Sequence, residues 1–179
     1  MSPNSRRVIA VFGGSRAPHD SAEYAEAYTI GKLLARASFI VMNGGYQGTM
    51  EASARGAKEN GGRTIGVLSD EFGWLSPNEY LDEIVPSADL FTRIRAMHAR
   101  ADGFVVLKGS MGTLAELAIV WNLAKIDTKH RKPIILLGDG WTQVLRVWRE
   151  HLAVTDEELR LLRVVNAPEE AVALLIEKL

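Results

Sequence analysis

Residues 103–116, with the sequence GFVVLKGSMGTLAE, join an apolar run, a glycine-rich turn and the start of a helical pattern. The run at 103–107 is typical of a buried strand, and apolar residues then recur at helical spacing to about Lys125. The first backbone N–H groups of a helix have no intrahelical acceptor, and the helix dipole favours an anion beside them. This stretch therefore predicts a strand–turn–helix unit that can bind a phosphate group.

Thr113 and Glu116 have two interpretations. In a ligand site, Thr113 supplies a hydroxyl, and Glu116 supplies a carboxylate roughly 4.5 Å further along the helix, about the distance from a 5′-phosphate to its ribose. The same two residues also have the spacing of a capping box, in which they would satisfy backbone donors at the start of the helix. This stretch leaves both interpretations open, and two further glycine turns in the chain favour the ligand.

Other apolar runs alternate with helical patterns along the chain. We expect strands at residues 8–12, 39–42, 64–68, 83–85, 103–107, 133–137 and 164–165. We expect helices at 24–37, 48–60, 88–101, from the turn at 109–112 to about 125, at 141–152 and at 168–179, with a short capped turn at 76–79. Asp20 and Glu23 have the spacing of a capping box for the first helix.

Strands that are apolar on both faces and alternate with helices form a parallel sheet that is covered on both sides. The predicted fold class is therefore α/β, with a doubly wound parallel sheet and helices on both faces. A chain of 179 residues without a linker or repeat is expected to form one domain, with a flexible N-terminus at 1–6.

A glycine turn follows three of the predicted strands, after residues 12, 42 and 107. Ligands of doubly wound sheets bind at the carboxyl ends of the strands, so we expect these turns to meet around one ligand. The alternative is that each glycine only makes a tight turn. The sequence does not favour a dinucleotide, because G-x-G-x-x-G is missing after the first strand and the second strand ends in Asn43-Gly44-Gly45 without an acidic residue.

Composition excludes several classes of function. The chain has no cysteine, which excludes disulfides, thiolate metal sites and a cysteine nucleophile. A formal net charge of −1 argues against broad binding of nucleic acid or anionic membranes. The four histidines are scattered, so no metal site is expected. No apolar run is long enough for a signal peptide or a membrane span, and we expect a cytoplasmic protein.

The segments GGYQGTM at 44–50 and GSMGTLAE at 109–116, together with Arg93 nine residues before Asp102, resemble the LONELY GUY (LOG) family, whose members are often labelled lysine decarboxylases. The resemblance covers roughly residues 8–137. It implies a Rossmann-like fold and a homo-oligomer, either a dimer or a tetramer. It also implies a phosphoribohydrolase, which cleaves the N-glycosidic bond of AMP or of cytokinin nucleoside 5′-monophosphates without a cofactor and releases base and ribose 5-phosphate.

Three positions depart from the family pattern. Lys108 replaces a proline, Ser110 replaces a glycine, and Ile94 replaces the lysine of an Arg-Lys pair. Lys108 either restores a positive charge near the phosphate or is simply solvated. These departures leave two alternatives to the enzyme: a non-catalytic carrier of a nucleotide or of the molybdenum cofactor, and a nucleotide sensor that acts through partners.

The resemblance implies a role for each matching residue. Glu116 is the predicted catalytic carboxylate, which stabilises a cation-like sugar and orients or deprotonates water. Arg93 is the second predicted catalytic residue, since a guanidinium can bind ribose or phosphate oxygens. The three glycine turns, taken together with the resemblance, give the predicted substrate-binding residues: Gly13, Gly14, Ser15, Gly44, Gly45, Gly48, Thr49, Met97, Lys108, Gly109, Ser110, Met111, Gly112 and Thr113. Met97 would contact the base or belong to the core.

Overall fold

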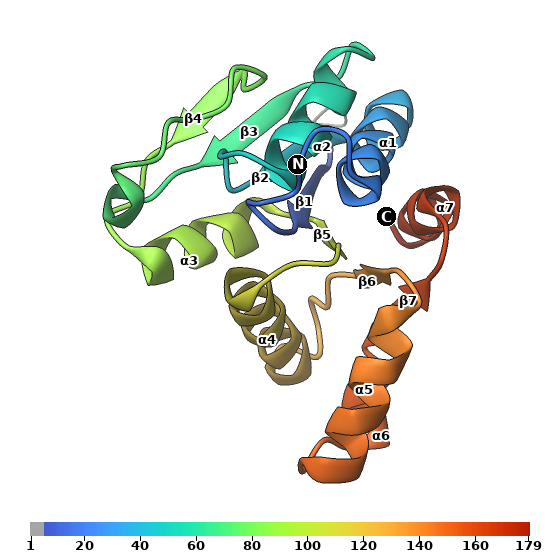
Figure 1. Ribbon diagram of the computed structural model, residues 1–179. Helices are drawn as coiled ribbons and strands as arrows, with labels where there is room; N and C mark the ends of the chain where they lie inside the picture. Colours follow the sequence, from blue (N-terminus) through green and yellow to red (C-terminus); the bar gives the residue numbers. More distant parts are fainter. Residues whose placement is uncertain (1–5) are drawn as a thin grey trace.

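The computed structural model describes residues 6–179, in which seven parallel strands form one sheet (Figure 1). The strands are β1 (Val8–Phe12), β2 (Ile40–Asn43), β3 (Thr64–Val67), β4 (Glu83–Val85), β5 (Gly103–Val106), β6 (Ile134–Leu137) and β7 (Leu162–Val165). Their order across the sheet is β4-β3-β2-β1-β5-β6-β7. The chain order reverses at β1, which lies between β2 and β5, and such a reversal marks the place where open α/β sheets bind ligands.

Helices cover both faces of this sheet. They are α1 (Ala22–Arg36), α2 (Thr49–Lys58), α3 (Leu90–Arg100), α4 (Met111–Ile126), α5 (Gly140–His151), α6 (Asp156–Leu159) and α7 (Pro168–Lys178), with a short 3₁₀ helix at Asp70–Phe72. Helices α1, α2 and α7 pack on one face and α3, α4 and α5 on the other. Figure 1 shows α5 and α6 projecting beyond the C-terminal half of the sheet.

Successive side chains along each strand point to opposite faces of the sheet, and this gives the core two halves. In β1, Ile9 and Val11 face the layer of α1 and α7, whereas Ala10 and Phe12 face the layer of α3 and α4. These side chains are almost completely buried, as expected for a parallel sheet with helices on both sides. The predicted α/β class with a doubly wound parallel sheet is therefore confirmed.

Most expected elements are present, with ends that differ by a few residues. Two local predictions are wrong. Ser21, and not Asp20, caps α1, because its side chain accepts the Tyr24 N–H. Residues 76–79 form no helical turn; there the side chain of Asn78 instead donates to the carbonyls of Gly45 and Tyr46. The expected flexible N-terminus falls, over residues 1–5, outside the part of the chain that the structure describes.

Candidate functional site

The three glycine turns meet at the carboxyl edge of the sheet, as expected. Both the backbone N–H and the hydroxyl of Thr49 donate to the carbonyl of Gly14, at 3.0 and 3.1 Å, and this joins the turns after β1 and β2. Gly48 has a φ of 69°, and a side chain there would collide with the same loop after β1. On its other side, Gly14 packs against Gly109 of the turn after β5.

A cavity of about 230 Å³ lies where these turns meet. Its walls carry three hydroxyls, from Ser15, Thr49 and Ser110, and two cationic side chains, from Arg16 and Lys108. Its other lining residues are Gly14, Ala17, Pro18, Glu23 and Gly109. The volume and the polar walls are suited to a phosphate-sized anion.

The start of α4 excludes one of the two interpretations of Thr113 and Glu116, the capping box. Ser110 is the N-cap residue, so Thr113 and Glu116 lie inside the helix and do not form a capping box. The side chain of Ser110 makes no capping hydrogen bond either. Thr113 is buried, with its hydroxyl against Gly109. The first N–H groups of α4 therefore lack a side-chain cap where the helix meets the cavity.

Arg93 and Glu116 form a buried ion pair. Arg93 Nη1 donates to Glu116 Oε1 at 3.3 Å, and the two residues are only 5% and 7% exposed. Burial raises the pKa of the Glu116 carboxyl to about 7, although the positive charge of Arg93 acts to lower it. A carboxyl with this pKa exchanges protons near neutral pH, which is the property of a general acid or base.

Several contacts hold the Arg93 guanidinium in place. Its Nε donates to the carbonyl of Val67, at the end of β3, at 2.7 Å. Its charge lies 5.8 Å from the ring centre of Tyr46 and 5.9 Å from that of Phe72. Gly44 packs directly beneath it, and a Cβ at that position would overlap Nη2. The predicted catalytic pair is thus assembled from α3 and α4 over the ends of β2 and β3.

The structure separates some predicted site residues from the cavity. Met97 is fully buried in the core with Phe12 and Phe104, which is the second of its two predicted positions, and it does not line the cavity. Gly45 lies against β3, and its N–H is bonded to the Asn43 side chain.

Two further predicted residues, Met111 and Gly112, lie in the first turn of α4 with exposed surfaces. Lys108 is exposed and pairs with Glu23 at 2.9 Å. Its charge is thus already partly neutralised at the rim of the cavity.

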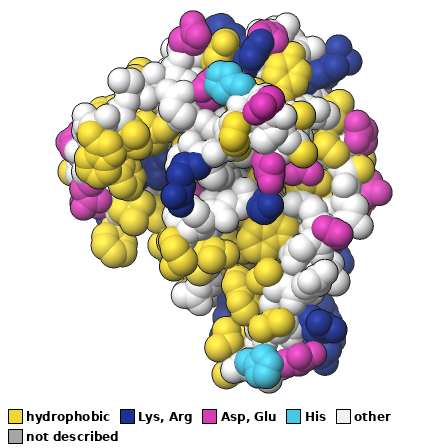
Figure 2. Space-filling model, in the orientation of Figure 1, with side chains coloured by type: hydrophobic (Ala, Val, Ile, Leu, Met, Phe, Trp, Pro, Cys, Tyr) yellow, Lys and Arg dark blue, Asp and Glu magenta, His cyan; other side chains and the backbone are white. Residues whose placement is uncertain are grey.

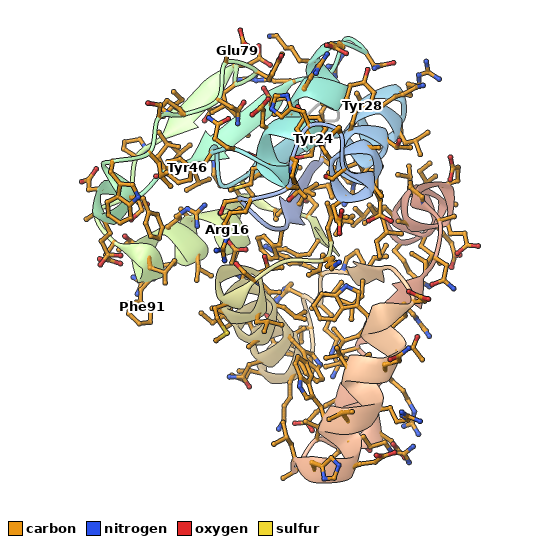
Figure 3. All side chains as sticks on the ribbon, viewed as in Figure 1. Arg16, Tyr24, Tyr28, Tyr46, Glu79 and Phe91 are labelled. Carbon is orange, nitrogen blue, oxygen red and sulfur yellow. The ribbon has the colours of Figure 1, made fainter. Side chains whose placement is uncertain are left out.

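Arg16 is a cavity residue that the sequence interpretation missed. It is exposed, lines the cavity, and forms no ion pair within residues 6–179. Figure 3 shows it near the start of α4, on the face of the molecule that carries the three turns. Its position in the sequence could have indicated this, because Arg16 directly follows Gly13-Gly14-Ser15. A basic residue beside an anion-binding turn can donate a charge-assisted hydrogen bond to the anion.

A second missed feature is the polar group around Glu51. This carboxylate is buried at the start of α2 and accepts a hydrogen bond from the Tyr24 hydroxyl at 3.0 Å. His19 Nε2 lies 3.2 Å from the same oxygen. These contacts join the loop after β1 to α1 and α2, so they help to position the wall of the cavity.

A model of the SLOG cluster4 family matches residues 6–172. This chain belongs to the SLOG cluster4 family. It is also 33% identical over 153 residues to the cytokinin riboside 5′-monophosphate phosphoribohydrolase of Mycobacterium tuberculosis, covering 83% of this chain and 80% of that one. A protein with the same name from Mycobacterium marinum is 30% identical, with 84% and 81% covered. The predicted relationship to LOG proteins is confirmed.

Solved structures extend the comparison of this SLOG protein. The molybdenum cofactor binding protein of Rippkaea orientalis has a TM-score of 0.76 at 24% identity and 97% coverage of both chains, which shows the shared fold. The molybdenum cofactor carrier protein of Chlamydomonas reinhardtii has a TM-score of 0.72 at 25% identity, with 97% of this chain and 98% of that one covered. Within the described residues, no helix of this SLOG protein is long and apolar enough to cross a membrane.

Proposed function

We propose that the protein hydrolyses the N-glycosidic bond of nucleoside 5′-monophosphates, either AMP or cytokinin-type nucleotides, and releases base and ribose 5-phosphate. The observation that carries this proposal is the buried Arg93–Glu116 pair, in which the Glu116 carboxyl has a pKa of about 7. The sequence likeness to proteins named as phosphoribohydrolases supports the same reaction.

The phosphate of the substrate would bind in the cavity between the three turns. The uncapped start of α4 offers backbone N–H groups, and Ser15 and Thr49 offer hydroxyls. Arg16 supplies the positive charge, because the other cation of the cavity, Lys108, is paired with Glu23. Ile94 is buried and apolar, so it supplies no positive charge at the position where the family pattern has a lysine. In this assignment Arg16 supplies that charge instead.

Hydrolysis breaks the bond between C1′ of the ribose and a nitrogen of the base, and water supplies the new C1′–O bond. The sugar becomes cation-like as the base leaves, and an ionised Glu116 stabilises that charge and accepts a proton from the attacking water. The departing base takes up a proton from the solvent. Arg93 holds the Glu116 carboxylate in position and reduces the cost of its ionisation.

A carrier that binds without turnover is the second candidate. It is favoured by the structural likeness to molybdenum cofactor binding and carrier proteins and by the loss of the lysine at Ile94. A carrier would use the phosphate cavity in the same way, but Glu116 would have no chemical role. The two candidates therefore differ in turnover and not in the presence of the cavity.

The decisive experiment is to incubate the protein with AMP and with isopentenyladenosine monophosphate and to measure free base by chromatography. We expect base and ribose 5-phosphate in equal amounts from at least one substrate. Glu116→Gln should lower the rate by about 100-fold or more, whereas Glu150→Gln, on the exposed face of α5, should not change it. Nucleotide binding without any release of base would instead support the carrier.

We also propose that the protein is a cytoplasmic homo-oligomer, either a dimer or a tetramer. Large apolar side chains on one side of the site support the oligomer, because Trp74, Phe91 and Met111 are 75%, 74% and 77% exposed. Figure 2 shows apolar side chains gathered on this face. The lack of cysteine agrees with a reducing compartment.

A further inference from the structure

A second and larger cavity lies beside the phosphate cavity. Its volume is about 750 Å³, which is within the range of small-molecule sites. It lies between the start of α1, the start of α4 and the inner face of α5. The side chains that give its walls their chemistry are those of Glu26, Lys108, Leu114, Asp139, Val144 and Trp148.

The two cavities adjoin each other. Glu23, Lys108 and Gly109 line both of them, so these residues form the junction. The Lys108–Glu23 ion pair at the junction is exposed, and exposed ion pairs of this kind contribute little to stability. A phosphate at the junction, in addition to the one beside Arg16, can therefore replace Glu23 as the partner of Lys108 at small cost.

The larger cavity lies on the side of the phosphate cavity that is away from the catalytic pair. Arg93 is bonded to Val67 at the end of β3, whereas the larger cavity lies over Leu137 and Gly138 at the end of β6. These strands are on opposite sides of β1 and β5 in the sheet. A ligand that places its ribose beside Glu116 and its phosphate at the start of α4 would therefore have free space beyond the phosphate.

The walls of the larger cavity select for an uncharged group. Leu114, Val144 and Trp148 provide apolar and aromatic surface. Glu26 and Asp139 provide carboxylates that can accept hydrogen bonds from hydroxyl or amino groups and that would repel an anionic group placed inside the larger cavity itself. A sugar or nucleoside fits this combination, because it has hydroxyls and no charge of its own.

We infer that the larger cavity is a second ligand subsite, which takes a sugar or nucleoside joined through the phosphate on the side away from Glu116. The complete site then fits nucleotides with a pyrophosphate link, and a nucleoside monophosphate fills only part of it. This inference rests on the phosphate position in the proposed function. It adds a ligand class to the site and does not depend on whether the ligand is hydrolysed.

Binding of AMP and ADP-ribose tests the inference. At neutral pH the two ligands carry nearly the same negative charge, so a difference in affinity reports contacts beyond the phosphate. Isothermal titration would use the Glu116→Gln protein, in which neither ligand is turned over. We expect ADP-ribose to bind at least about tenfold more tightly, since burial of roughly 60 Å² of apolar surface is enough for that factor.

Two substitutions on α5 make the test specific. Val144→Trp fills the larger cavity and should remove the preference for ADP-ribose. Val147→Trp, on the same helix but outside the cavity, should keep the preference. Glu26→Gln keeps the size of the side chain and should weaken the preference for ADP-ribose by about threefold. It replaces Val144→Trp as the test variant if Val144→Trp does not fold.

Equal affinities for AMP and ADP-ribose in the Glu116→Gln protein would overturn the inference, as would a preference that Val144→Trp and Glu26→Gln, each added to Glu116→Gln, both leave intact. The proposed function fails in a different way. If the parent protein releases no base but prefers ADP-ribose, the reaction is wrong and the subsite stands. If it releases base and shows no preference, the reaction stands and the subsite is wrong.

Discussion

The Arg93 guanidinium donates to the Glu116 carboxylate at 3.3 Å, and both groups are buried between α3 and α4. Desolvation raises the pKa of this carboxyl, whereas the positive charge of Arg93 lowers it, and the effect of desolvation is the larger of the two. The result is an acid whose pKa lies near the pH of most cells. The following predictions depend on this pair and on the loops around it.

The rate of base release should rise with pH through an inflection near pH 7. The ionised form of Glu116 stabilises the cation-like sugar, and its pKa is raised to about 7. The pH profile of kcat/KM for AMP measures this directly, and Glu116→Gln should remove the inflection together with the activity. A profile that is flat from pH 5 to 8 would exclude Glu116 as the titrating group.

Stability should respond to pH in the opposite direction. Because the folded-state pKa of Glu116 is raised, its stabilising contribution is complete below the unfolded pKa of about 4.5 and is lost as pH rises through about 7. From pH 5 to pH 8, the free energy of unfolding of the parent protein should therefore fall relative to that of Glu116→Gln, which has no carboxyl to titrate at this position. Urea denaturation at both pH values measures the difference, and a gain for the parent protein would contradict the buried state of this carboxyl.

Arg93→Ala should destabilise the fold and reduce base release. The substitution leaves a buried carboxyl without its cation, and breaking a buried pair in this way typically costs about 3–5 kcal/mol. The cost should be larger at pH 8 than at pH 5, since the attraction exists only while Glu116 is ionised. Urea denaturation at both pH values tests this, with Arg95→Ala as the control, because Arg95 is exposed on the same helix.

Gly44→Ala should reduce activity, whereas Gly140→Ala, at the start of α5 and outside the phosphate cavity, should not. A methyl group on Gly44 would overlap Arg93 Nη2, so the guanidinium must move away from Glu116. A methyl group on Gly140 meets no atom within 4 Å. Base release by both variants, with circular dichroism to confirm folding, measures the contrast. Equal activities would show that the position of Arg93 is not required.

Arg16→Ala should weaken the binding of AMP by about 10-fold or more and should not affect adenosine, because a hydrogen bond to a charged group contributes about 1.5–3 kcal/mol. Arg146→Ala is the matched control, since Arg146 is exposed on α5 and lines neither cavity. Isothermal titration with both ligands gives the comparison. A similar loss for adenosine would show that Arg16 supports the loop and does not contact the phosphate.

Substitution of the exposed aromatic residues should weaken self-association. Trp74 packs edge-on against Phe72 at 5.8 Å, and Phe91 extends from the first turn of α3, as Figure 3 shows. Replacing Trp74 and Phe91 by serine should lower the mass that light scattering measures after gel filtration. If the parent protein is already a monomer, the proposed oligomer is wrong.

The sequence predicted the layered fold because apolar runs and helical periodicity are local signals. The three glycine turns were visible for the same reason, and the rule for parallel sheets placed them at one edge. Short elements were less predictable. The 76–79 segment has the composition of a helical turn, but Asn78 is used to tie this loop to the carbonyls after β2.

The sequence by itself determined the order of strands and helices and the residue types at the carboxyl edge of the sheet, because these depend on spacing along the chain. Only the tertiary structure decided which of those residues act together. It put Met97 in the core and Arg16 at the cavity, and it buried Glu116 beside Arg93, 23 positions away in the chain. Burial and charge contacts set the chemistry of a side chain, and both arise from packing between segments that are distant in sequence.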